Sequence, residues 1–245
     1  MVSKNKILTE IDKILQTKGY KLTNIKIEDK CIKYEISYTY TNSNGEEITL
    51  ELHEFKKNNK TSQKAFRDRL LEAYNYQMTD GWRVDAYEDN ETPLPVDNWD
   101  NTRMFVTKRG STIAIRDDGD IISVCKNLSK IPSDNMKGVM QFATENGGTK
   151  LDSFGGNWGF YRACGFEPVS WIHFNEDYSP SGPNGWIKGT NLAEPIVFMK
   201  YTGKPYKLSA SEVLEEERNF YRNVTPNTGE NAYDDAYEIR DNDMK

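Results

Sequence analysis

Residues 147–169, GGTKLDSFGGNWGFYRACGFEPV, have the types and spacing of a segment that holds a ligand or a reacting group. They predict a strand over 150–154, a Gly-Gly turn, a short helix that begins at Asn157, and a second strand after it. Asn157 is a residue type that caps helix N-termini, and Gly165 is a type that ends helices. A strand, a helix and a strand in this order form the repeating unit of an α/β sheet, in which ligands bind beyond the carboxyl ends of strands. We therefore expect the functional site in this segment.

The other residue types that support chemistry form no comparable pattern. The three cysteines, Cys31, Cys125 and Cys164, are far apart and lack a CxxC spacing, which indicates packed thiols in a reducing compartment. The chain has two histidines, His53 and His173, and neither belongs to an HExxH motif, so we expect no metal site. A phosphate-binding Walker loop and a Gly-x-Ser-x-Gly elbow are also absent from the sequence.

The 147–169 segment resembles the C-terminal signature of the GNAT superfamily of acyl-CoA-dependent N-acetyltransferases. In that signature an Asn opens a helix that ends in Phe-Tyr, and Gly-Phe-Glu-Pro follows after three residues. The residues that carry it are Asn157, Phe160, Tyr161, Gly165, Phe166, Glu167 and Pro168. The resemblance covers about 81–203 and is closest to GNAT-like proteins of bacteriophages, which share the runs VTKRGSTIAI, DGDIISVCKN, FYRACGFEPVSW and EPIVFMKYTG in similar form. It implies a phage-encoded protein that transfers an acetyl group from acetyl-CoA to an amine of a protein or a small molecule.

The resemblance also implies roles for single residues. Tyr161 matches the general acid of the family, and a phenol with a pKa of about 10 can give a proton to a departing thiolate. The alternative is that Phe160 and Tyr161 are simply the buried face of a short helix. For the general base we consider Asp152 acting through water, although the same carboxylate could instead cap the Gly-Gly turn.

The cofactor would lie along the strand 121–126 and at the start of the following helix. The family places an Arg or Gln, two residues, Gly, one residue, and Gly or Ala before that helix, whereas this chain keeps one Gly and a Lys. The lysine fits a solvent-exposed helix position equally well. The expected acetyl-CoA residues are Val124, Cys125, Lys126, Lys137, Gly138 and Asn157.

The acceptor amine would be bound by residues that follow the signature. His173 comes after the family strand, and Tyr178 and Trp186 lie in the long Pro-, Gly- and Asn-rich stretch 175–194. Long loops inside a compact domain are commonly functional. A histidine in a strand is also often structural, so His173 has that second interpretation.

The expected fold class is α+β / α/β, a GNAT-like mixed and mostly antiparallel sheet flanked by helices. Residues 61–203 form the core, in which strands 121–126 and 149–154 are adjacent and diverge. Residues 1–60 are predicted to form a helix over 7–15 and strands near 23–28, 31–41 and 47–55, with a hairpin at Asn44-Gly45. Residues 204–245 begin with the capping box of Ser209 and Glu212, followed by a helix and an acidic tail with little regular structure beyond Asn223.

Charge and hydropathy restrict the partners. The formal net charge of −6 arises from residues 212–245, where ten acids face four bases, so nothing favours nucleic-acid binding. No apolar run approaches the length of about 20 residues that a membrane span needs, and Glu10 and Asp12 lie where a signal peptide is apolar, so we expect a cytoplasmic protein without a membrane partner. The alternative to an enzyme is a GNAT-like binding module without catalysis that engages a host protein through the hairpin region or the acidic tail.

Overall fold

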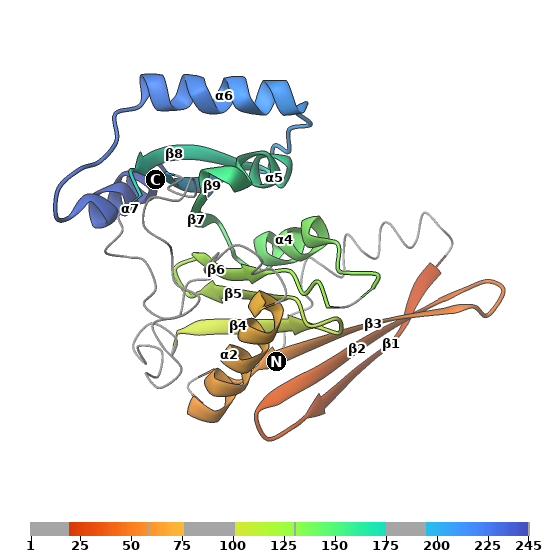
Figure 1. The fold of residues 1–245 in the computed structure, drawn as a ribbon. Helices are drawn as coiled ribbons and strands as arrows, with labels where there is room; N and C mark the ends of the chain where they lie inside the picture. Colours follow the sequence, from red (N-terminus) through yellow and green to blue (C-terminus); the bar gives the residue numbers. More distant parts are fainter. Residues whose placement is uncertain (1–19, 58, 76–100, 130, 175–194, 245) are drawn as a thin grey trace.

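The protein is an α+β chain with two antiparallel sheets, seen in a computed structural model that describes residues 20–57, 59–75, 101–129, 131–174 and 195–244 (Figure 1). The larger sheet has six strands in sequence order. These are β1 (Tyr20–Asp29), β2 (Lys33–Asn42), β3 (Glu47–Phe55), β4 (Thr102–Thr107), β5 (Thr112–Arg116) and β6 (Ile121–Cys125). The predicted mixed fold with a mostly antiparallel sheet flanked by helices is confirmed.

The second sheet has three strands in the order β7-β9-β8. They are β7 (Lys150–Phe154), β8 (Phe166–Ile172) and β9 (Ile196–Tyr201). The helices are α2 (Lys60–Asn75), α4 (Met136–Glu145), α5 (Trp158–Ala163), α6 (Ala210–Asn223) and α7 (Ala232–Asp243), and a short 3-10 turn, η1 (Gly155–Asn157), precedes α5. None of the helices in the described ranges is long and apolar enough to cross a membrane.

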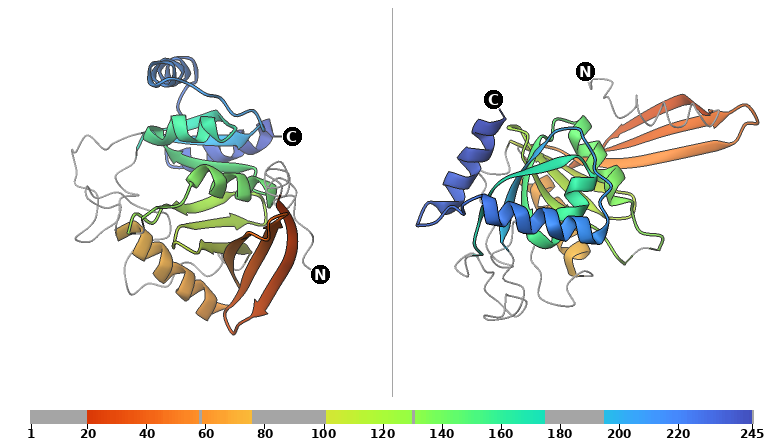
Figure 2. Two further views of the ribbon diagram at one scale, coloured as in Figure 1. Left: turned by 90° about the vertical axis from the view of Figure 1, so that its right-hand side faces the viewer. Right: turned by 90° about the horizontal axis from the view of Figure 1, so that it is seen from above.

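Strands β1, β2 and β3 form a ribbon that projects from the rest of the molecule (Figure 2). Its strands alternate between an apolar and a polar face, as with Ile36, which lies opposite Ile27 and Leu52. Gly45 has a φ of 77° in the turn between β2 and β3, a value that glycine adopts at low cost. The three predicted strands and the hairpin are therefore confirmed. Because β3 pairs with β4, the ribbon continues directly into β4, β5 and β6, which we call the core sheet.

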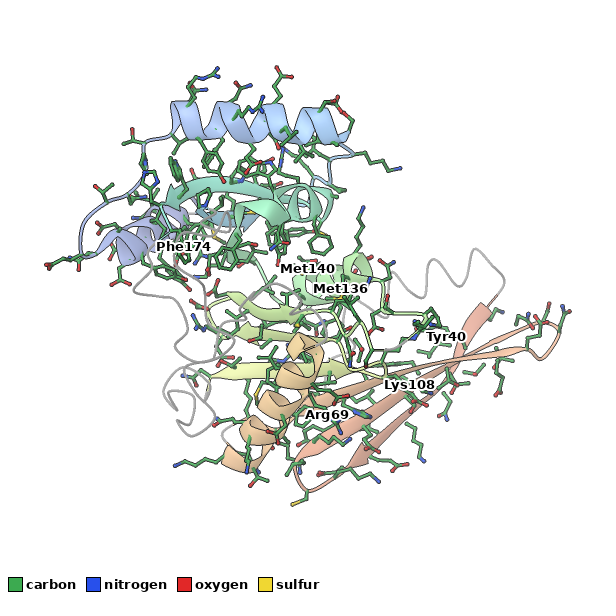
Figure 3. All side chains as sticks on the ribbon, viewed as in Figure 1. Tyr40, Arg69, Lys108, Met136, Met140 and Phe174 are labelled. Carbon is green, nitrogen blue, oxygen red and sulfur yellow. The ribbon has the colours of Figure 1, made fainter. Side chains whose placement is uncertain are left out.

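Each face of the core sheet is covered by helices. Helix α2 packs Phe66, Leu70 and Ala73 against one face, in a cluster that includes Met104 and Ile122. The other face forms the main core together with α4, α5 and the inner face of the second sheet. Helix α4 lies between the two sheets in Figures 1 and 3. The main core is therefore a layer shared by both sheets.

The two sheets meet where β6 and β7 begin. Asp120, just before β6, forms a parallel bridge with Lys150, the first residue of β7, and beyond this bridge the strands join different sheets. We call this bridge the β6–β7 junction. The Gly119 carbonyl accepts the backbone N–H groups of Thr149 at 2.8 Å and Lys150 at 3.3 Å. A Cβ on Gly148 would lie 2.6 Å from Ile121 Cγ1, so the close approach of the segments that lead into β6 and β7 requires glycine there. The strands are neighbours at their starts and then separate.

The C-terminal region is more ordered than its composition suggests. The capping box of Ser209 and Glu212 is present at the start of α6, as predicted. The prediction of little regular structure beyond Asn223 is wrong, because α7 packs on β8 and β9 with Ala236 and Arg240 fully buried. Acidic residues dominate the surface of α7, but its buried side consists of small, aromatic and paired groups. The helix predicted over residues 7–15 and the stretch 175–194 lie outside the described residues.

Candidate functional site

Strand β6 contains a bulge beside the β6–β7 junction. The pairs Thr112–Cys125 and Ala114–Ile122 leave Ser123 and Val124 opposite a single residue of β5. Ser123 has a φ of 55°, which is uncommon for a residue other than glycine, and its carbonyl accepts the Thr112 hydroxyl at 3.0 Å. The Ser123 Oγ is buried and has no hydrogen-bond partner among the described residues. Bulges and strained backbone occur preferentially next to functional sites, so β6 has local features of one.

The bulge also shifts the alternation of β6 by one residue, so that side chains three positions apart face the same side of the sheet. Ile121 and Val124 belong to the main core, whereas Ile122 and Cys125 face α2. Burial raises the pKa of the Cys125 thiol to about 12, which keeps it protonated at neutral pH. The Cys125 side chain is therefore an inert packing group on the side away from α5, and a ligand on the α5 side could meet only its backbone.

Tyr161 projects from α5 into the main core and is 7% exposed. Its ring packs edge-on against Phe160 at a centroid distance of 5.0 Å and against Phe166 at 6.1 Å. Val124 and Met140 belong to the same cluster. The structure thus places Tyr161 and Val124 in the same core cluster, and it places the phenol in an apolar layer from which bulk water is largely excluded.

Asn157 does not cap α5 as predicted. It occupies the N-cap position, but its φ and ψ of −92° and 2° differ from the extended conformation of a capping residue, and no side-chain cap is formed. Instead its Nδ2 donates to Ser153 Oγ at 3.1 Å. The cause is the 3-10 turn of Gly155–Asn157, which begins the helical conformation before Asn157. Asn157 is exposed and ties this turn to β7.

The start of α4 is open to solvent. Asn135 caps the helix by accepting the Lys137 backbone N–H at 3.2 Å, while Asp134 accepts the Thr107 hydroxyl at 2.6 Å. Lys137 and Gly138 are exposed, and a Cβ on Gly138 would come no closer than 4.0 Å to another residue. Figure 3 labels Met136 and Met140, which anchor the same helix between the sheets.

The first turn of α4 also lies close to the end of α5. Burial raises the pKa of the Cys164 thiol to about 11, and the Lys137 ammonium opposes that rise. Lys137 is therefore near enough to Cys164 to interact electrostatically. The exposed Lys137 adds a cationic side chain to this helix N-terminus, an arrangement that favours anions.

Asp152 lies on the other side of the second sheet from Tyr161. It pairs with Phe198 of β9, and residues directly opposite in an antiparallel pair point to the same face. Phe198 packs against α7, whereas the neighbouring Leu151 faces the main core with Tyr161. Burial opposes the charge of the Arg116 guanidinium, but Asp120, Tyr237 and, least of all, Asp152 together raise its pKa above the ordinary value. The structure therefore separates the two side chains expected as acid and base.

The remaining expected residues are dispersed. His173 is exposed just beyond the end of β8, where its ring packs edge-on against Trp171 at 4.8 Å. Lys126 is half-buried at the end of β6. Tyr178 and Trp186 lie outside the described residues. Within the described ranges no cluster of His, Cys, Asp and Glu side chains could hold a metal ion.

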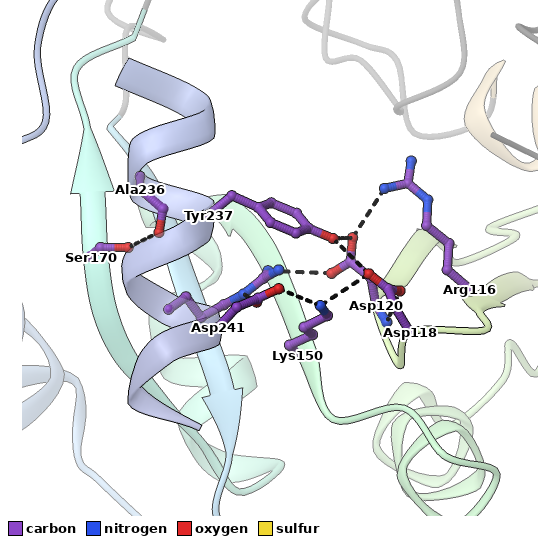
Figure 4. A network of polar contacts seen from close by, with 9 residues as sticks. Arg116, Asp118, Asp120, Lys150, Ser170, Ala236, Tyr237 and Asp241 are labelled. Carbon is purple, nitrogen blue, oxygen red and sulfur yellow. Dashed lines mark hydrogen bonds and ion pairs between the residues drawn. The ribbon is translucent and has the colours of Figure 1, made fainter. Parts of the chain in front are cut away.

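A buried polar network that sequence reasoning missed surrounds Asp120 at the β6–β7 junction (Figure 4). The Asp120 side chain is 1% exposed and accepts Arg240 Nη1 at 3.3 Å, Arg116 Nη1 at 3.2 Å and the Tyr237 hydroxyl at 2.9 Å. Burial raises the pKa of Asp120, and the two guanidinium groups oppose that rise. Lys150 continues the network, with its Nζ 2.7 Å from an Asp241 oxygen and 3.0 Å from Asp118.

The only sequence signal for this network was the placement of Arg240 among acidic residues. An arginine in an acidic stretch fits a solvated charge pattern equally well. Its partner Asp120 lies 120 positions earlier, in a turn where an aspartate needs no further explanation. The sequence alone therefore could not predict the contacts of this network.

A second polar contact fastens α6 to α5. Glu216 accepts Arg162 Nη2 at 2.7 Å and Trp158 Nε1 at 2.7 Å, and the Arg162 side chain is 6% exposed. Phe220 of α6 packs edge-on against Trp158 at 5.2 Å. Because Trp158 and Arg162 belong to the same helix as Tyr161, α6 fixes the position of the phenol from outside.

Comparison of the chain with protein-family models, with curated proteins and with solved structures found no match. The family resemblance therefore remains a proposal that rests on residues and geometry alone. The geometry that bears on it consists of the diverging β6 and β7, the bulge at Ser123, the open start of α4 and the buried Tyr161.

Proposed function

We propose that the protein is a GNAT-like acetyltransferase that binds acetyl-CoA where β6 and β7 diverge and transfers its acetyl group to an amine of a protein or a small molecule. One observation carries the proposal. Two parallel strand starts meet at the Asp120–Lys150 bridge and then enter different sheets, and the strained bulge of β6 lies directly after that point. Separation of two strands frees backbone groups that a ladder would otherwise occupy, which suits an amide-containing ligand.

The phosphates of acetyl-CoA would then meet the start of α4. Backbone N–H groups and the positive end of the helix dipole attract anions at such a terminus, and Lys137 adds a cation. Gly138 leaves space for a phosphate, since no other residue lies within 4 Å of the position of its absent Cβ except Asn135 Nδ2 at that limit. The start of α4 keeps one Gly of the family pattern and has a Lys, and it is thus compatible with cofactor binding.

The chemistry would proceed by attack of a neutral amine on the thioester carbonyl, followed by collapse of the tetrahedral intermediate. The C–N bond forms and the C–S bond breaks. The amine gives its proton to water, the CoA thiolate takes the proton of Tyr161, and water returns a proton to the phenol. The residue left out of the ladder at the bulge offers a backbone N–H to the developing oxyanion, and Tyr161 gives its proton to the thiolate. In this apolar layer both interactions are stronger than in water.

A non-catalytic binding module is the second candidate, and the position of Asp152 favours it. The face of the second sheet that carries Tyr161 does not carry Asp152, so this carboxylate cannot take the amine proton beside the phenol. In that case the chain would hold acyl-CoA without transfer, or would engage a host protein through the β1–β3 ribbon. A module that holds acyl-CoA would share the cofactor site with the enzyme and differ from it in turnover, whereas a module that engages a host protein needs no such site.

Thermal unfolding with and without acetyl-CoA tests the shared site. At a ligand concentration of 100 times the dissociation constant, the stabilisation should be about 2.7 kcal/mol. Gly138→Asp should abolish most of it, because a carboxylate would occupy the phosphate position, whereas Gly138→Ala adds only a methyl group in open space and serves as the control. Equal stabilisation of all three proteins would place the ligand elsewhere, and release of free CoA with an amine acceptor would separate enzyme from module.

A further inference from the structure

Helix α7 contacts both strands at the point where they separate. Tyr237 and Arg240 bind Asp120 ahead of β6, and Asp241 binds Lys150 at the start of β7 (Figure 4). The main chain of α7 is itself held to the second sheet, since Ser170 Oγ of β8 donates to the Ala236 carbonyl at 2.6 Å. One helix therefore links the last strand of the first sheet to the first strand of the second.

The charges of these contacts balance, and Asp120, Lys150 and Arg240 are buried at their centre, whereas Arg116, Asp118 and Asp241 are 33%, 50% and 33% exposed. Three cations, Arg116, Lys150 and Arg240, face three carboxylates, Asp118, Asp120 and Asp241. The Arg240 guanidinium also lies 3.9 Å from the centre of the Tyr237 ring. Removing one member of such a set leaves an opposite charge buried without compensation. Loss of Arg240 or of Asp120 would therefore weaken the attachment of α7 strongly.

The network is not fully satisfied. Arg240 Nη2 and Arg116 Nε are buried and have no hydrogen-bond partner in the described part of the chain. A buried polar group without a hydrogen-bond partner is not compensated for the cost of its burial, so a network with such groups is less stable than a complete one. The α7 contact is thus less favourable than a complete network of the same size, which leaves room for a second, detached arrangement of the helix.

We propose that α7 is a clamp that sets the separation of β6 and β7 and thereby controls the affinity of the site between them for acyl-CoA. The ligand half of this inference rests on the proposed function, whereas the clamp itself does not. If docking of α7 favours the binding-competent separation, acyl-CoA must in turn favour docking of α7 by the same factor. Coupling between sites typically amounts to about 5–150-fold in affinity.

The test uses a double variant that carries both Tyr237→Phe and Asp241→Asn, so that α7 loses one contact to each strand. It is compared with the single variant Asp243→Asn. The control changes the same residue type on the same helix, where Asp243 is half exposed and pairs with Lys200, the residue of β9 opposite Lys150, instead of with Lys150 itself. Hydrogen exchange without ligand reports on the clamp through the Thr149 and Lys150 amides, which donate to Gly119. Calorimetry then gives the acetyl-CoA affinity of each protein.

The clamp predicts faster exchange of the Thr149 and Lys150 amides in the double variant and about tenfold weaker acetyl-CoA binding. The control should match the wild type within about twofold, as expected for an exposed pair. Unchanged exchange at these amides would overturn the clamp, and faster exchange with unchanged affinity would overturn its control of the site. If the wild type binds no acetyl-CoA, the proposed function fails, and the exchange at the junction still decides the clamp. Should the double variant not fold, Tyr237→Phe alone retains the ring and permits the same comparison.

Discussion

The β1–β3 ribbon and the β6–β7 junction use charged side chains in opposite ways. In the ribbon, Lys26 pairs with Glu28 at the surface, where their side chains are 64% and 35% exposed. At the junction, Arg240 pairs with Asp120 at 0% and 1% exposure. Exposed pairs contribute about 0–1 kcal/mol, whereas breaking a buried pair costs about 3–5 kcal/mol. The charges of the ribbon keep a surface solvated, and those of the junction hold two sheets together.

The two regions differ also in the sequence separation of their contacts. The ribbon pairs strands that follow one another directly, such as β1 with β2. The junction unites Asp120, Lys150 and Arg240, which come from three distant parts of the chain. Long-range contacts of this kind are the ones that define the position of a site, and the following predictions test that difference.

The largest effect is expected for the Tyr161 phenol in the main core. Tyr161→Phe keeps the ring and its packing but removes the proton that the proposed mechanism gives to the leaving thiolate, so the proposal predicts a rate of acetyl transfer about 10²–10⁴-fold lower with the acetyl-CoA affinity unchanged. Tyr38→Phe, in the ribbon, is the matched control and should leave the rate as it is. Release of CoA thiol in the presence of an amine acceptor measures the rate. An equal rate in both variants would assign Tyr161 to packing alone.

The buried pair of the junction gives the next largest effect. Arg240→Ala leaves the Asp120 carboxylate buried without its main partner, and the free energy of unfolding should fall by about 3–5 kcal/mol. Lys26→Ala removes an exposed pair of the ribbon and should change the free energy of unfolding by less than about 0.5 kcal/mol. Urea unfolding of the three proteins measures both. Similar losses for the two variants would break the distinction between the regions.

Acid should release α6 from α5. Burial disfavours the Glu216 carboxylate, but hydrogen bonds from Arg162 and Trp158 outweigh it and lower its pKa below the ordinary 4.5. A lowered folded pKa gives stability that is present above 4.5 and is lost as the pH falls through the lowered value. Tryptophan fluorescence should therefore change in this acidic window, and Glu216→Gln should remove that step. A step that persists in the variant would assign it to another carboxylate.

The smallest effect is expected at the bulge. Ser123→Gly relieves a positive φ and removes a buried hydroxyl without a described partner, so the free energy of unfolding should rise by about 1 kcal/mol. Gly45→Ala in the ribbon turn is the reverse experiment and should lower it by a similar amount, because alanine would have to adopt a φ of 77°. Thermal unfolding measures both. A destabilised Ser123→Gly would indicate that the hydroxyl has a structural partner.

The elements that could be predicted are those with a local signal. The alternation of Ile36, Tyr38 and Tyr40 predicted β2, and Ser209 with Glu212 predicted the start of α6. Helix α7 was missed because its composition is that of a solvated acidic segment, and its docking depends on the partner of Arg240, which no local pattern reveals.

The candidate site could be predicted only in part. The segment around Tyr161 was located correctly in the fold, but Asn157 fails to cap because a 3-10 turn precedes it. The face of Asp152 follows from its alternation with Leu151, once that residue is known to lie in the main core. The bulge at Ser123 has no sequence signal that we recognise, since its cause is the register between β5 and β6.

Hydrogen exchange of the wild-type chain with and without acetyl-CoA tests the proposed site most directly. We predict slower exchange with acetyl-CoA in peptides that cover 121–126 and 135–140, with no change in the β1–β3 ribbon. The reason is that bound ligand would protect the bulged strand and the start of α4, whereas most of the ribbon projects away from both (Figure 2). Unchanged exchange throughout, or protection confined to the ribbon, would contradict a cofactor site where β6 and β7 diverge.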